Sequence, residues 1–184
     1  MNLYAYAGNN PIGFSDPFGL CPPEDTNVGD CDATTTLGGA WIALDGTGAV
    51  GKKVIQGVVD KGMAVTAGAV NNDACGSKHA CYDRGTNSMT LNEADPAGAM
   101  AVSIAHEFHH STQSPARTAG QYGRNELAAW DAAEPVYGAL GNNYRAQAES
   151  VYGNAFKVLG TPDGRAASVR HWTTLAKDKW DLPF

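Results

Sequence analysis

Apolar residues recur at helical spacing in several parts of the chain. The first clear set, at positions i, i+4, i+5, i+8 and i+9, is Val50, Val54, Ile55, Val58 and Val59. On an α-helix these side chains share one face, so the pattern predicts an amphipathic helix. The apolar residues 64–67 either extend this helix or begin a strand.

Two short segments of strand-forming residues flank a polar turn. Residues 81–82 and 88–91 lie on either side of the turn sequence Asp83-Arg84-Gly85-Thr86-Asn87. A glycine-containing polar turn between two such segments is typical of a β-hairpin. We therefore expect a small sheet just before the apolar segment that begins at residue 97.

A helix is predicted to follow the hairpin. Asp95-Pro96 is a helix-start signal, with Asp95 as the N-cap and Pro96 at the first helical position. The helix should end near Ser111 or Thr112, because the residue before Pro115 disfavours helical backbone.

The rest of the chain also reads as helical. After a loop containing Gly120 and Gly123, residues 124–134 favour a helix that Pro135 interrupts. Apolar residues at helical spacing predict another helix over 144–156, and Thr161-Pro162 begins the last one. The chain is thus expected to be α+β and helix-dominated, with a small sheet or hairpin.

Composition and charge narrow the function classes. The chain has 184 residues, which suits one compact domain, and its 43% of hydrophobic residues can form a core. The 13 basic residues are scattered and the net charge is −6, which disfavours nucleic-acid binding because such proteins usually present a basic face. No apolar run approaches the roughly 20 residues of a membrane span, and no secretion signal opens the chain.

The four cysteines fall in two close pairs, Cys21 with Cys31 and Cys75 with Cys81. An even count with local pairing predicts two short-loop disulfides, which persist in oxidising compartments. Four reduced thiols are the alternative. Zinc binding by Cys75, His79 and Cys81 is disfavoured, because the cysteines are further apart than in structural zinc sites.

Three of the five histidines lie within the segment SIAHEFHHST, residues 103–112. His106 and His110 are four positions apart, so on a helix two imidazoles can meet one cation. Glu107 lies about 100° further round the helix, within reach of a water at that cation. This His-Glu-x-x-His arrangement predicts a zinc site with Glu107 as the general base. His109 points about 100° away from His110 and is expected to support the ligands or to be exposed. The alternative is a helix whose histidines are satisfied by hydrogen bonds in the core.

A catalytic zinc site usually has three protein ligands and one open position. Glu126 is the favoured third ligand, because 16 positions after His110 leave room for the chain to turn and bring a second helix alongside. Glu134 is its main competitor. The group that stabilises a tetrahedral oxyanion stays open between Tyr122, Tyr137 and His171, with Tyr122 as the working candidate.

The segment from Asn125-Glu126 to Asp131 resembles the gluzincin pattern of thermolysin-class zinc metallopeptidases. The resemblance implies that Glu126 is the third ligand. It also implies that Asp131, one position further on than in that family, orients a histidine. Finally, it implies a zincin-like fold with an edge strand beside the metal, here Ser88–Leu91, along which an extended peptide substrate can add.

Residues 1–20, MNLYAYAGNNPIGFSDPFGL, are rich in turn residues and lack helical periodicity. They resemble the end of the Rhs/YD-repeat core, the β-cage that encloses polymorphic toxins. The residues that carry the closing signature are Pro11, Asp16, Pro17, Gly19 and Leu20. The resemblance implies that the cage ends at Leu20 and is autocleaved there, with Asp16 in the cleaving apparatus. Residues 21–184 would then form the C-terminal toxin domain.

These observations together predict a zinc metallopeptidase toxin that hydrolyses protein or peptide substrates in a target cell. The Rhs resemblance further implies a secreted effector, exported by machinery such as type VI secretion, and a cognate immunity protein. The cysteine pairs favour action outside the reducing cytosol, as in a target cell's periplasm. The alternatives are a zinc amidase acting on peptidoglycan peptides and a non-catalytic, metal-stabilised binding toxin. A nuclease is disfavoured by the charge and by the metal motif.

Overall fold

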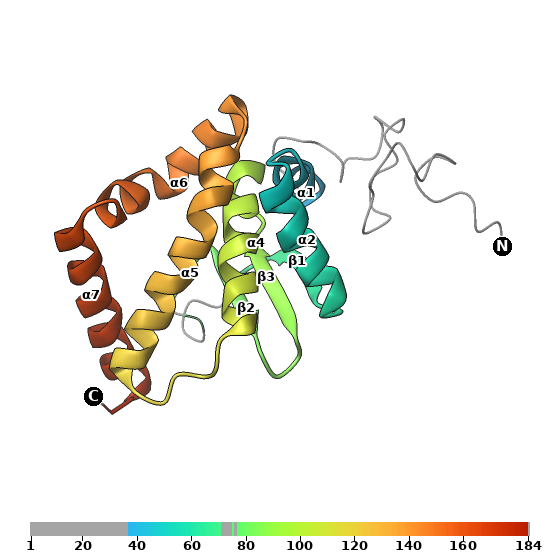
Figure 1. Cartoon of the computed structure of the whole chain (residues 1–184). Helices are drawn as coiled ribbons and strands as arrows, with labels where there is room; N and C mark the ends of the chain where they lie inside the picture. The colour runs from blue at the N-terminus through green and yellow to red at the C-terminus, as the bar shows by residue number, and fades with distance from the viewer. Residues whose placement is uncertain (1–36, 71–74, 76, 184) are drawn as a thin grey trace, which may run out of the picture.

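The structure of the protein is a computed structural model, described here for residues 37–70, 75 and 77–183 (Figure 1). The elements are α1 (Leu37–Asp45), α2 (Ala49–Asp60), β1 (Ala64–Gly68), β2 (Ala80–Asp83), β3 (Ser88–Asn92), α4 (Ala97–Thr112), α5 (Ala119–Ala139), α6 (Asn142–Leu159) and α7 (Pro162–Trp180). The Rhs-like residues 1–20 lie outside the described residues, so the predictions for them stay predictions. The described part is α+β and dominated by helices, as expected.

The small sheet has three strands in the order β1-β3-β2. The hairpin of β2 and β3 is confirmed, with Tyr82 opposite Met89, and residues 64–67 form a strand parallel to β3. The prediction that residues 88–91 form an edge strand is wrong. Because β1 pairs with the other side of β3, β3 is central, and β1 and β2 form the two edges.

Helix α4 lies at the centre of the molecule, with α1 and α2 on one side, α5 on the other and the sheet behind it (Figure 1). Its residues 97–107 are all buried. A helix that is apolar on every face is one that packs on every face. Gly98 shows how closely: a Cβ there would collide with the backbone carbonyl of Tyr144 in α6.

The start of α4 differs from the prediction. Pro96, with φ −70° and ψ 157°, is the N-cap, and no side chain caps the helix. Asp95 instead contacts His79, with 2.8 Å between its Oδ2 and the imidazole Nδ1. The Gly98 N–H donates to the side chain of Gln147 at 2.8 Å, so α6 satisfies a helix-start donor that a cap would otherwise serve.

Helix α5 is longer than its sequence suggests. It begins after Thr118, whose hydroxyl accepts from the Gln121 N–H at 3.1 Å, and runs through Gly120, Gly123 and Pro135 to Ala139. The predicted loop and the predicted interruption are therefore wrong. A proline inside a helix costs about 3 kcal/mol. Packing of α5 against both α4 and α7 outweighs that cost.

The remaining helices agree with the sequence except for one. Helices α2 and α6 lie where their apolar spacing predicts them, and α7 begins where Thr161-Pro162 predicts. The Thr161 hydroxyl caps α7 by accepting from the Gly164 N–H. Helix α1 was not predicted, because LGGAWIALD contains two glycines and lacks a polar face. Within the described ranges, no helix is both long and apolar enough to cross a bilayer.

Candidate metal centre

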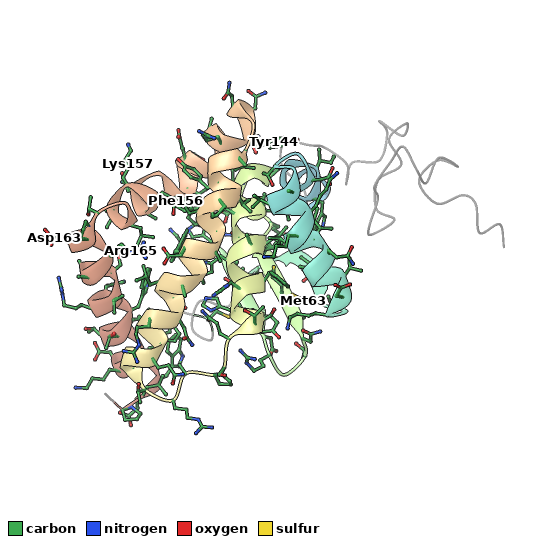
Figure 2. All side chains as sticks on the ribbon, viewed as in Figure 1. Met63, Tyr144, Phe156, Lys157, Asp163 and Arg165 are labelled. Carbon is green, nitrogen blue, oxygen red and sulfur yellow. A yellow bond between two sulfur atoms is a disulfide. The ribbon has the colours of Figure 1, made fainter. Side chains whose placement is uncertain are left out.

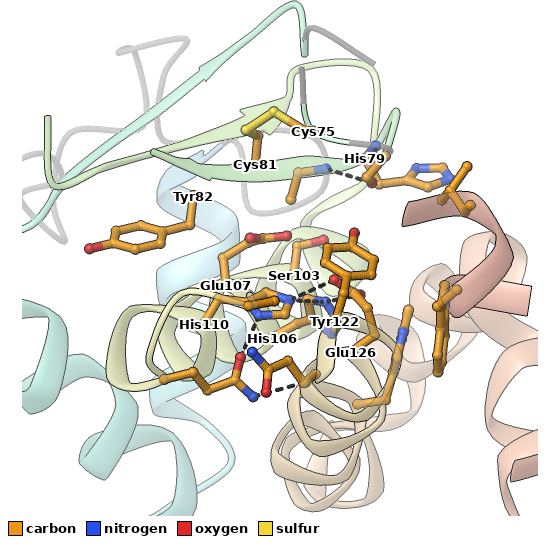
Figure 3. Close-up of a pocket in the computed structure, with 18 of the residues that line it drawn as sticks. Cys75, His79, Cys81, Tyr82, Ser103, His106, Glu107, His110, Tyr122 and Glu126 are labelled. Carbon is orange, nitrogen blue, oxygen red and sulfur yellow. Dashed lines mark hydrogen bonds and ion pairs between the residues drawn. A yellow bond between two sulfur atoms is a disulfide. The ribbon is translucent and has the colours of Figure 1, made fainter. Parts of the chain in front are cut away.

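The two motif histidines of α4 and a glutamate of α5 converge at one point (Figure 3). The Nε2 atoms of His106 and His110 are 3.0 Å apart. Carboxylate oxygens of Glu126 lie 3.5 Å from the first nitrogen and 3.3 Å from the second. The structure thus brings together the three residues that the sequence nominated as ligands, and Glu134 is not among them.

These separations suit a small divalent cation. Around an ion with bonds of about 2.0–2.1 Å, tetrahedral geometry places neighbouring donor atoms about 3.3 Å apart. The observed 3.0, 3.3 and 3.5 Å lie close to that value. Two imidazoles and one carboxylate form a donor set used by catalytic zinc sites. The residues present therefore fit a zinc ion.

A glutamine holds one of the imidazoles in place. Nδ1 of His110 lies 2.8 Å from Oε1 of Gln113, and the Gln113 amide in turn donates to the Asn125 carbonyl of α5 at 2.8 Å. Because Nδ1 carries the proton for that bond, Nε2 keeps its lone pair for a cation. His106 is held differently: its ring packs edge-on against the Trp130 ring, with 4.7 Å between the ring centroids. Sequence reasoning missed both supports, although a glutamine one turn beyond the last histidine was a usable signal.

The charges of the site are strongly coupled. Burial lowers the pKa of His110, but the hydrogen bond to Glu126 and the nearby carboxylates raise it to about 9. Burial raises the pKa of Glu126, but the two imidazoles outweigh burial and hold it well below its ordinary value. Without a cation His110 is therefore readily protonated beside the Glu126 carboxylate, and a proton competes with a cation for its Nε2.

Glu107 lies next to the ligands without being one. It is 7% exposed, and burial raises the pKa of its carboxyl, partly offset by the two histidines. The backbone of Tyr82 in β2 also faces this carboxyl and lowers its pKa slightly, without cancelling the effect of burial. A carboxylate with a raised pKa beside a candidate metal site is suited to accept and return a proton.

Of the three candidates for stabilising an oxyanion, only Tyr122 lies at the site. It lines the same cavity as Glu126, and burial together with that carboxylate raises the pKa of Tyr122 far above its ordinary value, so it stays protonated. Tyr137 donates to Glu149 at 3.1 Å. His171 is exposed and does not line the cavity.

The remaining nominated residues lie elsewhere. His109 is half-buried and is not part of the ligand group. The expectation that Asp131 orients a histidine is wrong, because it forms a two-pronged ion pair with Arg165 at 2.6 and 2.7 Å. Five positions along a regular helix turn it about 140° away from Glu126. Glu134 is exposed and lies near Arg165.

The predicted disulfide between Cys75 and Cys81 is present, with 5.6 Å between the Cα atoms. The disfavoured alternative, a zinc site formed by these two sulfurs and His79, is excluded because both sulfurs form the disulfide. Both cysteines and His79 line the same cavity as the metal centre (Figure 3).

The second predicted disulfide, between Cys21 and Cys31, is not tested by the structure. Cys21 and Cys31 both lie outside the residues that the structure describes. Their pairing therefore stays a prediction from the sequence, and nothing in the metal centre depends on it.

The cavity above the metal centre has a volume of about 740 Å³. Its floor is the metal centre, one side is the edge strand β2, and the other side is formed by apolar residues of α7. The chain matches no protein-family model, no curated protein and no solved structure. The function therefore has to be inferred from the geometry of this site.

Proposed function

We propose that this chain is a zinc-dependent metallopeptidase, with zinc held by His106, His110 and Glu126. The observation that carries the proposal is the convergence of these three donors at ligand spacing, with the buried Glu107 beside them and a large cavity above them. A purely structural metal site is closed by four protein ligands, whereas a catalytic one keeps a position open.

The chain's own residues suggest how the reaction would proceed. Zinc, when bound, would supply Lewis acidity toward a carbonyl and toward water. Glu107 accepts a proton from the attacking water and delivers it to the leaving amine. Its raised pKa supports both halves of that task. Tyr122, still protonated, donates to the oxygen that gains negative charge.

Strand β2 supports a peptide substrate in particular. The Asn92 N–H donates to the His79 carbonyl at 2.8 Å, and Cys81 pairs with Thr90 two residues later. Ala80 and Tyr82 alternate with these pairs, so their backbone groups face the free edge. The Tyr82 N–H points at Glu107. An extended peptide adding along this edge would pass directly over the proposed base.

We further propose, on the resemblance of residues 1–20 to the Rhs core, that the peptidase is a secreted effector toxin with a cognate immunity protein. The Cys75–Cys81 disulfide supports action in an oxidising compartment such as a target cell's periplasm.

The test is metal content by mass spectrometry followed by peptidase assays. We expect about one zinc per wild-type chain, lost in His110→Ala and Glu126→Ala and kept in the matched control Glu134→Ala. Glu107→Gln should keep the metal and lose about 10²–10⁴-fold in peptide cleavage.

Three outcomes would contradict the proposal. Failure of the wild type to bind zinc would leave a histidine-bearing helix without a metal. Toxicity that survives in Glu107→Gln would indicate a metal-stabilised binding module. Cleavage of peptidoglycan peptides but not of proteins would indicate an amidase.

A further inference from the structure

The last helix, α7, turns its apolar side chains toward the cavity instead of the core. Of its 19 residues, Ala176 is the one that is buried. Trp172, Leu175 and Trp180 are half-buried and line the cavity above the metal centre. We refer to these three residues as the α7 wall. Large apolar side chains that stay partly exposed inside a concave site are typical of ligand-binding surfaces.

The α7 wall is continuous with the metal centre through one residue. The Trp180 ring lies 5.1 Å from the ring of Tyr122, centroid to centroid. Tyr122 lines the cavity together with Glu126, the proposed third ligand. A group bound against the wall would therefore lie beside the atoms that carry out the reaction.

Helix α7 is fastened to α5 at three levels, as the side-by-side course of the two helices in Figure 2 illustrates. Near its start Arg165 pairs with Asp131, and just beyond its end the Pro183 carbonyl accepts from the Ala119 N–H at 2.6 Å. Between them the helices meet at Gly123, where a Cβ would lie 2.7 Å from the Val169 carbonyl. The wall is thus held in place before any ligand arrives, which reduces the entropy cost of binding.

We propose that the α7 wall, with Tyr122 at its inner end, is the specificity pocket of this enzyme. It takes a bulky apolar side chain, such as Leu or Phe, of a polypeptide bound along the β2 edge. This inference rests on the proposed function. Apart from the indole N–H groups, the side chains of the wall are apolar, so burial against them favours an apolar side chain over a charged one.

The wall's chemistry also separates substrate classes. Hydroxyl-rich sugars need several hydrogen-bonding partners, whereas a leucine or phenylalanine side chain needs only apolar area. Strand β2, with the backbone groups of Ala80 and Tyr82 on its free edge, lines the cavity together with the apolar side chains of α7. That division of roles fits a peptide backbone on one side and its apolar side chain on the other.

The test measures binding separately from cleavage. Blocked alanine-based hexapeptides, with one Leu or Phe moved through each position, are titrated calorimetrically into zinc-loaded Glu107→Gln protein. We expect at least tenfold tighter binding than for the all-alanine peptide at one position of the series. The variants Trp172→Ala and Leu175→Ala should each remove most of that preference, and Trp172→Phe should keep it. The matched control is His171→Ala, which changes the neighbouring, exposed residue of α7.

The same peptides are then given to the wild type, with melting temperatures of all variants as a check on folding. If binding depends on the α7 wall but the wild type does not cleave the peptides, the binding role of the wall is supported and the proposed peptidase function is overturned. If the wild type cleaves the peptides without preference for Leu or Phe, the specificity role of the α7 wall is overturned and the proposed peptidase function is supported. A preference that survives both alanine variants, or binding of glycan chains but not of apolar peptides, would also overturn the wall.

Discussion

The two halves of α4 have opposite tasks. Residues 97–105 are buried and almost entirely apolar or small, and Gly98 meets the α6 backbone so closely that a methyl group would not fit. From His106 onward the helix carries ionisable side chains that face α5, β2 and the cavity. One half stabilises the fold through packing, while the other buries polar groups that neighbouring elements must satisfy.

The difference shows which groups stabilise the buried polar side chains of the site. Glu107 faces the backbone of Tyr82, His110 is held by Gln113, and Glu126 is shared between two imidazoles. Each of these partners comes from another element or from just beyond the end of α4. The apolar half anchors the helix so that the polar half can hold its side chains in one arrangement.

The largest expected effect on stability comes from the apolar half. Gly98→Ala should lower the free energy of unfolding by roughly 2–3 kcal/mol, because the added Cβ forces α4 and α6 apart. The matched control is Gly138→Ala in α5, where nothing lies within 4 Å of the added carbon. That change should stabilise by about 0.5–1 kcal/mol through lower backbone entropy. Urea denaturation measures both. Equal effects of the two substitutions would show that the close approach at Gly98 is not rigid.

A smaller effect is expected in the polar half, on metal affinity. Gln113→Ala removes the acceptor that orients His110, so zinc should bind about 10–100-fold more weakly while the fold is kept. The control is Gln56→Ala, which changes an exposed glutamine of α2 that does not line the cavity. Competition with a chromophoric chelator measures the affinity. An unchanged affinity would mean that the imidazole is oriented by the rest of the site alone.

The smallest expected effect is on thermal stability, at the proposed base Glu107. Burial raises the pKa of this carboxyl above 4.5, so the folded state disfavours its ionised form. That penalty is absent below pH 4.5, where the carboxyl is protonated both folded and unfolded, and it grows as the pH rises through the raised pKa. In metal-free protein, Glu107→Gln should therefore melt higher than wild type at pH 7, by roughly 2–4 °C for about 1 kcal/mol. The gain should vanish near pH 4.5.

Thermal melts of both proteins at the two pH values, after removal of metal by chelation, check this. A gain of the same size at both pH values would show that the desolvated charge is not its cause. With zinc bound the gain should shrink, since the cation favours the ionised carboxyl.

Much of this protein can be predicted from its sequence because the signals are local. Apolar spacing within one helix predicts α2 and α6, the Asp95-Pro96 start signal predicts α4, and turn residues between two short strand-forming segments predict the β2–β3 hairpin. The pair His106 and His110 needs only the geometry of one helical turn to share a cation. The nomination of Glu126 drew on loop length and on a resemblance, and the convergence of α4 and α5 agrees with it.

The tertiary structure decided what depends on partners far along the chain. Pro135 stays helical because α5 is packed on two sides, and Asp95 contacts His79 instead of capping α4. Strand β1 makes β3 central and leaves β2 as the edge above Glu107. The apolar face of α7 could be found from its spacing. Only the fold shows that this face borders the metal centre, because a residue pattern determines which face of a helix is apolar and not what lies opposite it.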